Sequence, residues 1–324
     1  MKIIFLGSPE FAIKPLEAVI DAGHEILAVV TQPDNPANRG QKLVPCPLKV
    51  FAKEKGLKVL CYEKISRDGV QELKKMKPDL MVTCAYGQIL SQEIIDIAKL
   101  GIINVHGSLL PKYRGASPIA SAIIAGETET GITIMQTEAG LDCGDILKVK
   151  KTLIYDGETA GELIERLSSI GAQALVETIE DFENDRVTRI RQVHADATFT
   201  TKLTKVGATL NFNKTATQLN NLVRGSNPNP VARAFINGEM LKIYKARVRE
   251  DLKTTAPAGT IIEPTSAKNG VFVACGVGVL ELLIVQLPGG KEVEAKALVS
   301  GRKIEKGLVF SEFSSTIKNN GANI

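Results

Sequence analysis

Apolar runs of four to six residues recur through the first 150 residues, and segments with helical spacing separate them. The segment 10–22 places Phe11, Leu16 and Val19 on one face, and Gly23 follows as a helix end. Strands joined by such helices form right-handed crossovers in a mostly parallel sheet. The runs expected to form strands are residues 2–6, 26–30, 57–60, 80–85 and 102–105. This pattern predicts an α/β domain with a Rossmann-like sheet.

Residues 132–136 and 146–149 predict two strands added to this sheet. Thr159 and Glu162 have the spacing of a capping box, which predicts a long helix from there to about residue 182. Between residues 184 and 204 the pattern gives way to polar residues, as is typical of a linker.

Beyond the linker the chain changes to short β-rich runs broken by glycine, proline and asparagine, with one helix expected over residues 215–224. The runs are residues 232–236, 241–249, 259–263, 271–274 and 279–285. This spacing fits a small barrel or sandwich, and we expect an OB-like β-barrel. A chain of 324 residues has room for two domains. The expected boundaries are 1–187 for the first domain, 188–206 for the linker, 207–312 for a basic β-barrel and 313–324 for a frayed tail.

Charge is spread unevenly along the chain. From residue 201 onward there are 17 Lys and Arg against 9 Asp and Glu, whereas the earlier residues have 23 against 27. A basic second domain suggests a polyanionic partner. The alternative is a solvated, lysine-rich surface, and charge alone does not separate the two.

The chain has five cysteines, an odd number, and they lie far apart with no C-x-x-C motif among them. This argues against a disulfide framework and against a zinc site of ordinary spacing, so we expect a reducing, cytoplasmic setting and no bound metal. No apolar run reaches 18 residues, so no membrane span is expected.

The turn after the first expected strand reads Gly7, Ser8, Pro9. A dinucleotide fingerprint needs a second glycine where Pro9 stands, because the pyrophosphate approaches the backbone there and proline removes a donor. The turn therefore argues against NAD or FAD. It still indicates a tight strand-to-helix connection at the carboxyl edge of the sheet, where ligands bind in such folds.

Asn104 and His106 end an apolar strand, and strand alternation sends both to one face. An amide donor can bind an oxyanion, and an imidazole can donate a hydrogen bond or move a proton. The alternative for a lone histidine is a satisfied core residue. Here the turn 107–111 follows at once and offers backbone donors and two apolar side chains that suit a flat ring.

Asp142 lies in a glycine-flanked loop that can present a carboxylate at unusual backbone angles. The alternatives are a solvated acidic turn or a calcium loop, but the oxygen ligands are too few for the latter.

Residues 31–47 form a long, proline-rich stretch with Arg39 and Lys42, which we expect to be a loop without regular structure. Such loops are usually functional or disordered. It is either a basic arm that becomes ordered on a substrate or a disordered surface loop.

These residues together resemble the 10-formyltetrahydrofolate-dependent formyltransferases. The resemblance rests on NVHGSLLPKYRGASP with GLDCGD about 30 residues later, and on GSPEFA, TQPDNPANRG, AYGQIL and TGITIMQ around them. It covers essentially the whole chain. Members that formylate glycinamide ribonucleotide end after the first domain. Members with a basic β-rich second domain and an NLVRGSNPNP-like segment act on initiator methionyl-tRNA. The resemblance thus implies that this chain transfers formyl from 10-formyltetrahydrofolate, a substrate and not a tightly bound cofactor, to the methionine α-amine.

The resemblance also assigns site residues. The catalytic positions fall on Asn104, His106 and Asp142: the first two donate to the oxyanion, and Asp142 orients His106 and assists proton transfer. Folate contacts fall on Ser108, Leu109, Leu110, Pro111, Tyr86, Gly87, Gln88, Ile89 and Leu90. The basic loop near the acceptor end of the tRNA makes Arg39 and Lys42 candidate contacts.

Strand 241–249 carries Lys245, Arg247 and Arg249 on one face, which makes it the candidate phosphate track; the alternative is an ordinary solvated edge. Two departures from the family pattern are Asn229, where many members have tryptophan, and Ser91, where many have proline. We expect a monomer.

Three rival classes remain at this point. A formyltransferase acting on an amino sugar is expected to be coupled to a nucleotide-sugar domain. A formate-releasing hydrolase is usually marked by a regulatory domain ahead of the catalytic one. A non-catalytic RNA-binding protein is the third, and the intact set of Asn104, His106 and Asp142 argues against it.

Overall fold

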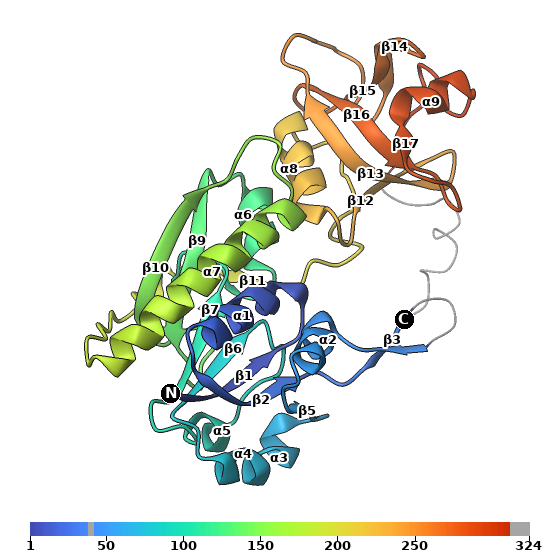
Figure 1. Cartoon of the computed structure of the whole chain (residues 1–324). Coiled ribbons are helices and arrows are strands. Elements are labelled where there is room, and N and C mark those ends of the chain that lie inside the picture. The colour runs from blue at the N-terminus through green and yellow to red at the C-terminus, as the bar shows by residue number, and fades with distance from the viewer. Residues whose placement is uncertain (38–41, 312–324) are drawn as a thin grey trace, which may run out of the picture. The chain divides into compact units, whose positions relative to one another are not determined.

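A computed structural model describes residues 1–37 and 42–311 of the chain (Figure 1). The chain divides into two compact units. The first comprises Met1–Pro118, Glu129–Leu153 and Leu163–Thr200, and the second Ile119–Thr128, Ile154–Glu162 and the chain from Thr201. No helix in the described part is both long and apolar enough to cross a membrane.

The first unit is built on a seven-stranded sheet in the order β10-β9-β7-β6-β1-β2-β5. Neighbours from β7 to β5 run parallel, while β9 and β10 are antiparallel additions at one edge. The strands are β1 (Lys2–Gly7), β2 (Glu25–Thr31), β5 (Val59–Cys61), β6 (Leu80–Cys84), β7 (Ile102–His106), β9 (Glu129–Gln136) and β10 (Ile146–Leu153). The predicted mostly parallel sheet is confirmed.

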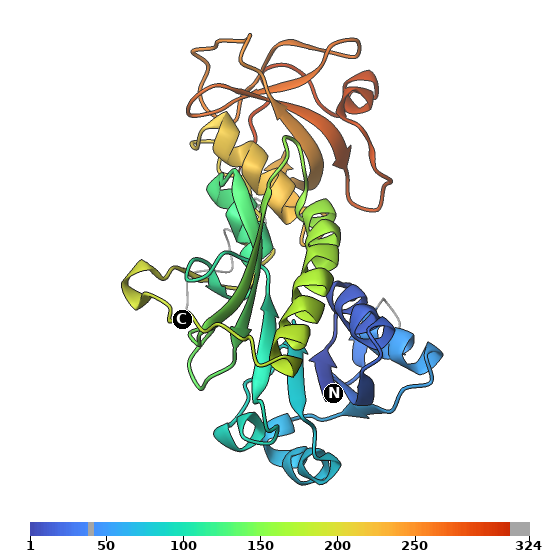
Figure 2. The same cartoon turned by 60° about the vertical axis from the view of Figure 1, so that its left-hand side comes forward.

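Helices cover both faces of this sheet (Figure 2), which explains why its strands read as continuous apolar runs. Consecutive residues from Ile3 to Leu6 on β1 are all fully buried. One face carries α3 (Ile65–Asp68), α4 (Val70–Met76) and α5 (Gln92–Ile95). The opposite face carries α1 (Ile13–Asp21), α2 (Pro47–Glu54) and α7 (Ala160–Glu183).

The turn after β1 approaches its neighbours closely. A side-chain carbon at Gly7 would lie 2.8 Å from the Cys84 carbonyl oxygen and 2.9 Å from Ala12 Cβ. Glycine is therefore required there by contact with β6 and with the next helical turn. That turn is a 3-10 segment, Glu10–Ala12, so the helix predicted from residue 10 begins as α1 only at Ile13.

The stretch 31–47 contains more regular structure than predicted. β3 (Asn35–Ala37) and β4 (Lys42–Val44) pair antiparallel, and α2 begins at Pro47. The prediction of a loop without regular structure was wrong, because a two-stranded ribbon pairs backbone groups of the long connection. Arg39 lies outside the described residues, and Lys42 is described only through its place in β4.

The predicted capping box before the long helix is confirmed. The Thr159 amide donates to Glu162 Oε2 at 2.8 Å, and the Glu162 amide donates to Thr159 Oγ1 at 3.3 Å. The capping box thereby satisfies two of the amides at the start of α7 that have no partner within the helix.

The second unit is built on an antiparallel sheet in the order β12-β13-β16-β15-β14, with β17 beside β16. Its strands are β12 (Ala232–Ile236), β13 (Glu239–Val248), β14 (Ile261–Ser266), β15 (Gly270–Ala274), β16 (Val279–Gln286) and β17 (Val293–Glu294). The chain near its described end joins the two outer strands: Thr260 pairs with Val309 next to β14, and Phe235 of β12 pairs with Ser311. This closure confirms the predicted small barrel-like domain.

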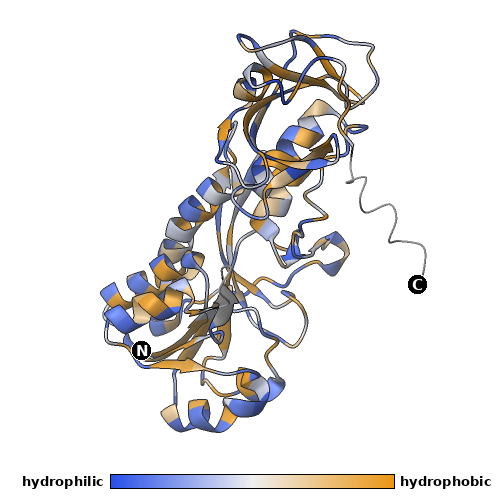
Figure 3. Cartoon of the chain, turned by 90° about the vertical axis from the view of Figure 1, so that its right-hand side faces the viewer, coloured by the Kyte–Doolittle hydropathy of each residue, from blue (hydrophilic) through white to orange (hydrophobic). Residues whose placement is uncertain are grey.

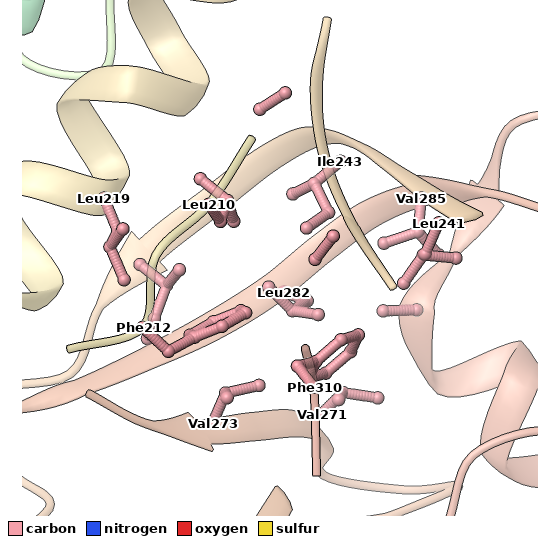
Figure 4. Close-up of a cluster of buried hydrophobic side chains, with 14 of the residues drawn as sticks. Leu210, Phe212, Leu219, Leu241, Ile243, Val271, Val273, Leu282, Val285 and Phe310 are labelled. Carbon is pink, nitrogen blue, oxygen red and sulfur yellow. The ribbon is translucent and has the colours of Figure 1, made fainter. Parts of the chain in front are cut away.

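The interior of this barrel is apolar (Figure 4). Phe212 and Phe310 stack with ring centroids 5.2 Å apart, and Leu282 and Val285 of β16 face the same core. Helix α8 (Ala216–Ser226) contributes Leu219 and is capped by Thr215 and Gln218. In Figure 3 hydrophobic colour follows the strands of this unit, while its outer loops are mostly hydrophilic.

Candidate active site

Asn104 and His106 lie on β7 at the carboxyl edge of the parallel strands. Asn104 is paired in register with Thr83 of β6, and the Thr83 hydroxyl donates to Asn104 Oδ1 at 2.9 Å. This contact fixes the amide so that its NH₂ group is left to donate elsewhere. Thr83 is therefore a partner of the site that the sequence analysis missed.

His106 is buried, and each of its ring nitrogens has a defined neighbour. Nε2 lies 3.0 Å from the Tyr113 carbonyl oxygen. A carbonyl only accepts, so Nε2 carries a proton and donates to it. Nδ1 faces Asp142 Oδ2 at 3.7 Å, which is too long for a direct hydrogen bond but close enough for charge interaction.

Burial lowers the pKa of His106 below its ordinary value, and the nearby Arg114 guanidinium lowers it further. Asp142 and the hydrogen bond to Tyr113 oppose this shift by raising the same pKa. The imidazole is therefore neutral near pH 7, with its proton on Nε2 and a lone pair on Nδ1 directed to the side of Asp142.

Asp142 takes an unusual backbone angle, with φ of 45°, as the glycine-flanked loop predicted. Its Oδ2 accepts a hydrogen bond from the Gly115 amide at 2.7 Å. Gly115 belongs to β8 (Arg114–Gly115), which pairs with β11 (Phe199–Thr200). Gly115 has φ of +102°, and a Cβ there would lie 2.5 Å from the Thr200 carbonyl oxygen, so only glycine can bring its amide to Asp142.

The turn after His106 divides into buried and accessible side chains. Ser108 is fully buried, and its hydroxyl donates to the Lys112 carbonyl at 2.7 Å. Leu110 packs with Met135 and Ile146. Of the four predicted folate contacts in this turn, only Leu109 and Pro111 keep part of their surface accessible.

The segment 85–90 divides in the same way. Tyr86 is buried, and Leu90 packs on the same core; the Gln88 side chain bonds to the backbone at Tyr62 and Ile65. In contrast, Gly87 is exposed, and Ile89 has 92% of its surface accessible. The accessible part of this predicted folate-binding segment is therefore its backbone at Gly87 together with Ile89. The side chains of Tyr86, Gln88 and Leu90 instead anchor the segment to the domain.

Ser91 stands where many members of the resembling family have proline. Its amide donates to Ser66 Oγ at 2.9 Å, a bond that proline cannot make. The departure thus has a local partner that holds the end of this segment.

In the second unit, β13 carries two of the three candidate phosphate contacts. Register shifts on both sides of Lys245 leave Lys245 and Arg247 exposed, whereas Arg249 lies beyond the end of the strand. Arg247 and Arg249 both bond to Glu281, a buried carboxylate of β16, at 2.6 and 3.0 Å. Of the three, only Lys245 makes no close ion pair within the described residues, although its charge lowers the pKa of Glu162.

Three further residues of the site differ in how far the sequence could have indicated them. Thr83 is a polar residue within an otherwise apolar strand, which is a readable signal. Tyr113 acts through its carbonyl, which any residue has, so no side-chain pattern marks it. Gly115 follows the motif directly, but its need for a positive φ is visible only in the structure.

Comparisons with known proteins agree on one family. Residues 1–179 match the family described as Formyl transferase, and residues 202–303 match the Formyl transferase C-terminal domain. The methionyl-tRNA formyltransferase of Acetivibrio thermocellus is 42% identical over 313 residues, which is 96% of this chain and 100% of the relative. That of Alkaliphilus oremlandii is 43% identical over the same shares. The chain belongs to the methionyl-tRNA formyltransferase family.

Solved structures of more distant proteins share the fold. The N-formyltransferase from Helicobacter canadensis, solved with folinic acid and dTDP-3-aminofucose, aligns with a TM-score of 0.65. It covers 87% of this chain and 98% of its own, at 19% identity. At that identity the likeness concerns the fold alone, so a sugar substrate is not implied for this member of the methionyl-tRNA formyltransferase family.

The Asp142→Asn substitution tests the charge relation at His106. Because Asp142 raises the His106 pKa against burial, removing its charge lowers that pKa further below the ordinary value. NMR titration of the imidazole resonances measures this, since the chain has only three histidines. His24, whose pKa burial also lowers, is the internal control and should not move. An unchanged or raised His106 pKa would contradict the assigned geometry.

Proposed function

We propose that this chain transfers the formyl group of 10-formyltetrahydrofolate to the α-amino group of methionine on initiator methionyl-tRNA, for the initiation of translation. The folate is a substrate that enters and leaves, so no tightly bound cofactor is needed. Asn104, His106 and Asp142 all come from the first unit of one chain, so the proposed site needs no second subunit, and the protein is proposed to act as a cytoplasmic monomer.

One observation carries the proposal. His106 Nδ1 and Asp142 face one another beside Asn104 at the carboxyl edge of the sheet, in a chain 42% identical over 313 residues to a methionyl-tRNA formyltransferase. An amide donor, a neutral imidazole and a carboxylate are what acyl transfer to an amine requires.

The reaction begins when the neutral methionine amine attacks the N10-formyl carbon. A carbon–nitrogen bond forms, and the formyl oxygen becomes an oxyanion in a tetrahedral intermediate. The Asn104 NH₂ group, which the Thr83 hydroxyl orients, donates to this oxyanion. One such donor is worth roughly 2.7–4 kcal/mol in other enzymes.

Proton transfer completes the reaction through His106. Its Nε2 is committed to the Tyr113 carbonyl, so Nδ1 is the nitrogen that acts on the substrate. Neutral Nδ1 takes the proton that the amine loses, and Asp142 stabilises the imidazolium. The imidazolium then returns the proton to N10 as the bond from N10 to the formyl carbon breaks, which releases tetrahydrofolate and N-formylmethionyl-tRNA. His106 donates to the oxyanion only in its protonated form.

The folate ring is placed between the accessible parts of the two segments described above. Leu109 and Pro111 offer apolar surface on one side, and the backbone at Gly87 with Ile89 offers the other. Accessible apolar side chains beside an accessible backbone segment suit a flat ring with polar edges.

The first experiment decides the acceptor. With labelled 10-formyltetrahydrofolate, we expect formyl transfer to initiator methionyl-tRNA and none to the same tRNA without methionine. The acceptor is the amine of methionine and not the nucleic acid. Label on the uncharged tRNA, or release of free formate without an acceptor product, would rule the proposal out.

Substitution of Asn104 by alanine removes the oxyanion donor. We expect kcat to fall about 10²- to 10³-fold, with the KM for 10-formyltetrahydrofolate changing much less, because the lost contact forms mainly in the transition state. Asn184→Ala, at the exposed end of α7, is the control and should keep wild-type turnover. Near-normal kcat in Asn104→Ala contradicts the role.

Charge reversal at Lys245 tests the phosphate track. Lys245→Glu should raise the KM for tRNA at low salt and reduce the slope of log KM against log salt by about 1. Lys151→Glu, an exposed lysine of the first unit, makes the same change in net charge and serves as control. If both variants shift the KM equally, only overall charge matters and the track is wrong.

A further inference from the structure

Gln192 is a buried residue in an otherwise exposed polar stretch. It keeps 4% of its surface accessible, whereas Arg191 is exposed and Val193 keeps 59%. This stretch belongs to the first unit and pairs with its other segments: Ile190 pairs with Ile146, and β11 pairs with β8. Burial of a single glutamine between exposed neighbours indicates that its side chain bonds to specific buried partners.

The side-chain amide of Gln192 uses its full hydrogen-bonding capacity. Oε1 accepts from Arg114 Nη2 at 2.6 Å and from Nε at 3.1 Å. Nε2 donates to the Asp142 carbonyl at 2.9 Å and to the Gly144 carbonyl at 2.7 Å. Arginine only donates and carbonyls only accept, so the orientation of the amide is unambiguous.

The loop that Gln192 holds carries the catalytic carboxylate. Asp142 has φ of 45°, a conformation that a non-glycine residue keeps only when its surroundings hold it. Gly140 and Leu141, just before it, are exposed. Gln192 grips carbonyls on both sides of Cys143, so it fixes the backbone from which Asp142 projects.

Arg114 connects this grip to His106. It is buried, and its hydrogen bonds go to the Gln192 amide and, at 3.3 Å, to His194 Nδ1. Its chain neighbours contact the centre directly, because the Tyr113 carbonyl accepts from His106 and the Gly115 amide donates to Asp142. Gln192 thus joins the segment that holds His106 to the loop that holds Asp142.

We infer that Gln192 is a positioning residue for formyl transfer: it fixes the Asp142 loop to residues 113–115 so that Asp142 Oδ2 stays beside His106 Nδ1. The inference deepens the proposed function and rests on it. Gln192 does not touch the substrate, so its loss affects turnover through the placement of Asp142, and a displacement of about 1 Å at such a site can cost up to about 10²-fold in rate.

The test is Gln192→Met in the full chain, with Gln136→Met as a matched control. The Gln136 side chain makes the same kinds of contact with other partners: it accepts from Arg189 at 3.0 Å and donates to the Leu100 and Ile102 carbonyls at 3.4 and 3.0 Å. Both variants lose a similar set of hydrogen bonds. We expect kcat to fall roughly 10- to 10²-fold in Gln192→Met alone, with both substrate KM values changing less than about threefold.

Amide hydrogen exchange gives a second readout that does not depend on activity. The Gly115 amide donates to Asp142 Oδ2, whereas the amides of Arg114 and Ala116 donate to carbonyls of Thr198 and Thr200. In Gln192→Met the Gly115 amide should lose protection relative to these two neighbours. In Gln136→Met all three should exchange as in the wild type.

The inference is supported if Gln192→Met shows both the fall in kcat and the loss of Gly115 protection while Gln136→Met shows neither. Turnover close to that of the control, or a Gly115 amide that stays protected, overturns it. If Gln192→Met does not fold, Gln192→Asn, which keeps the amide one methylene shorter, is judged by the same two readouts. If the wild type formylates no methionyl-tRNA, the proposed function is wrong, and Gly115 exchange alone decides whether Gln192 holds Asp142.

Discussion

The hydrogen bond from His106 Nε2 to the Tyr113 carbonyl determines what the rest of the site can do. It fixes the ring and the tautomer and leaves Nδ1 as the nitrogen available to a substrate. Asp142 therefore lies on the Nδ1 side of the ring, where the Gly115 amide holds its carboxylate by a hydrogen bond. Because Tyr113 and Gly115 flank Arg114, a segment of three consecutive residues holds both His106 and Asp142.

Burial and charge act in opposite directions at this centre. A fully neutral surrounding would hold His106 deprotonated and unable to carry a proton, whereas a strong ion pair with Asp142 would hold it charged and unable to accept one. Burial and Arg114 lower its pKa, and Asp142 and the Tyr113 carbonyl raise it. In the proposed reaction, a group poised between these influences takes a proton from the amine and returns it to N10 within one turnover.

Much of the first unit was predictable because apolar runs report burial on both faces of a parallel sheet. The strands, their parallel pairing and the Thr159 capping box follow from local pattern alone. The β3–β4 ribbon could not be predicted in this way, since its residues show no alternation of apolar and polar side chains. The stretch around Gln192 reads as linker because only one of its side chains is buried, and a single buried amide leaves no periodic signal.

The site shows a similar division. Asn104, His106 and Asp142 were identified from residue type and family resemblance, and the structure brings His106 and Asp142 to 3.7 Å. Resemblance also named whole segments as folate contacts, yet it could not separate Ile89, which is exposed, from Tyr86, which is buried. That division depends on how each segment lies on the core beneath it, which is a property of packing and not of the motif.

The second unit shows why a count of charges is a weak guide to a binding surface. Arg247 and Arg249 add to the net charge of the domain, but both are paired with the buried carboxylate of Glu281. Releasing them to bind phosphate would leave that buried carboxylate unpaired, which costs about 3–5 kcal/mol when a buried pair is broken. A phosphate gains less than this from an exposed arginine. The two arginines therefore belong to the fold of the barrel first, and the proposed phosphate contact falls on Lys245, which makes no such ion pair within the described residues.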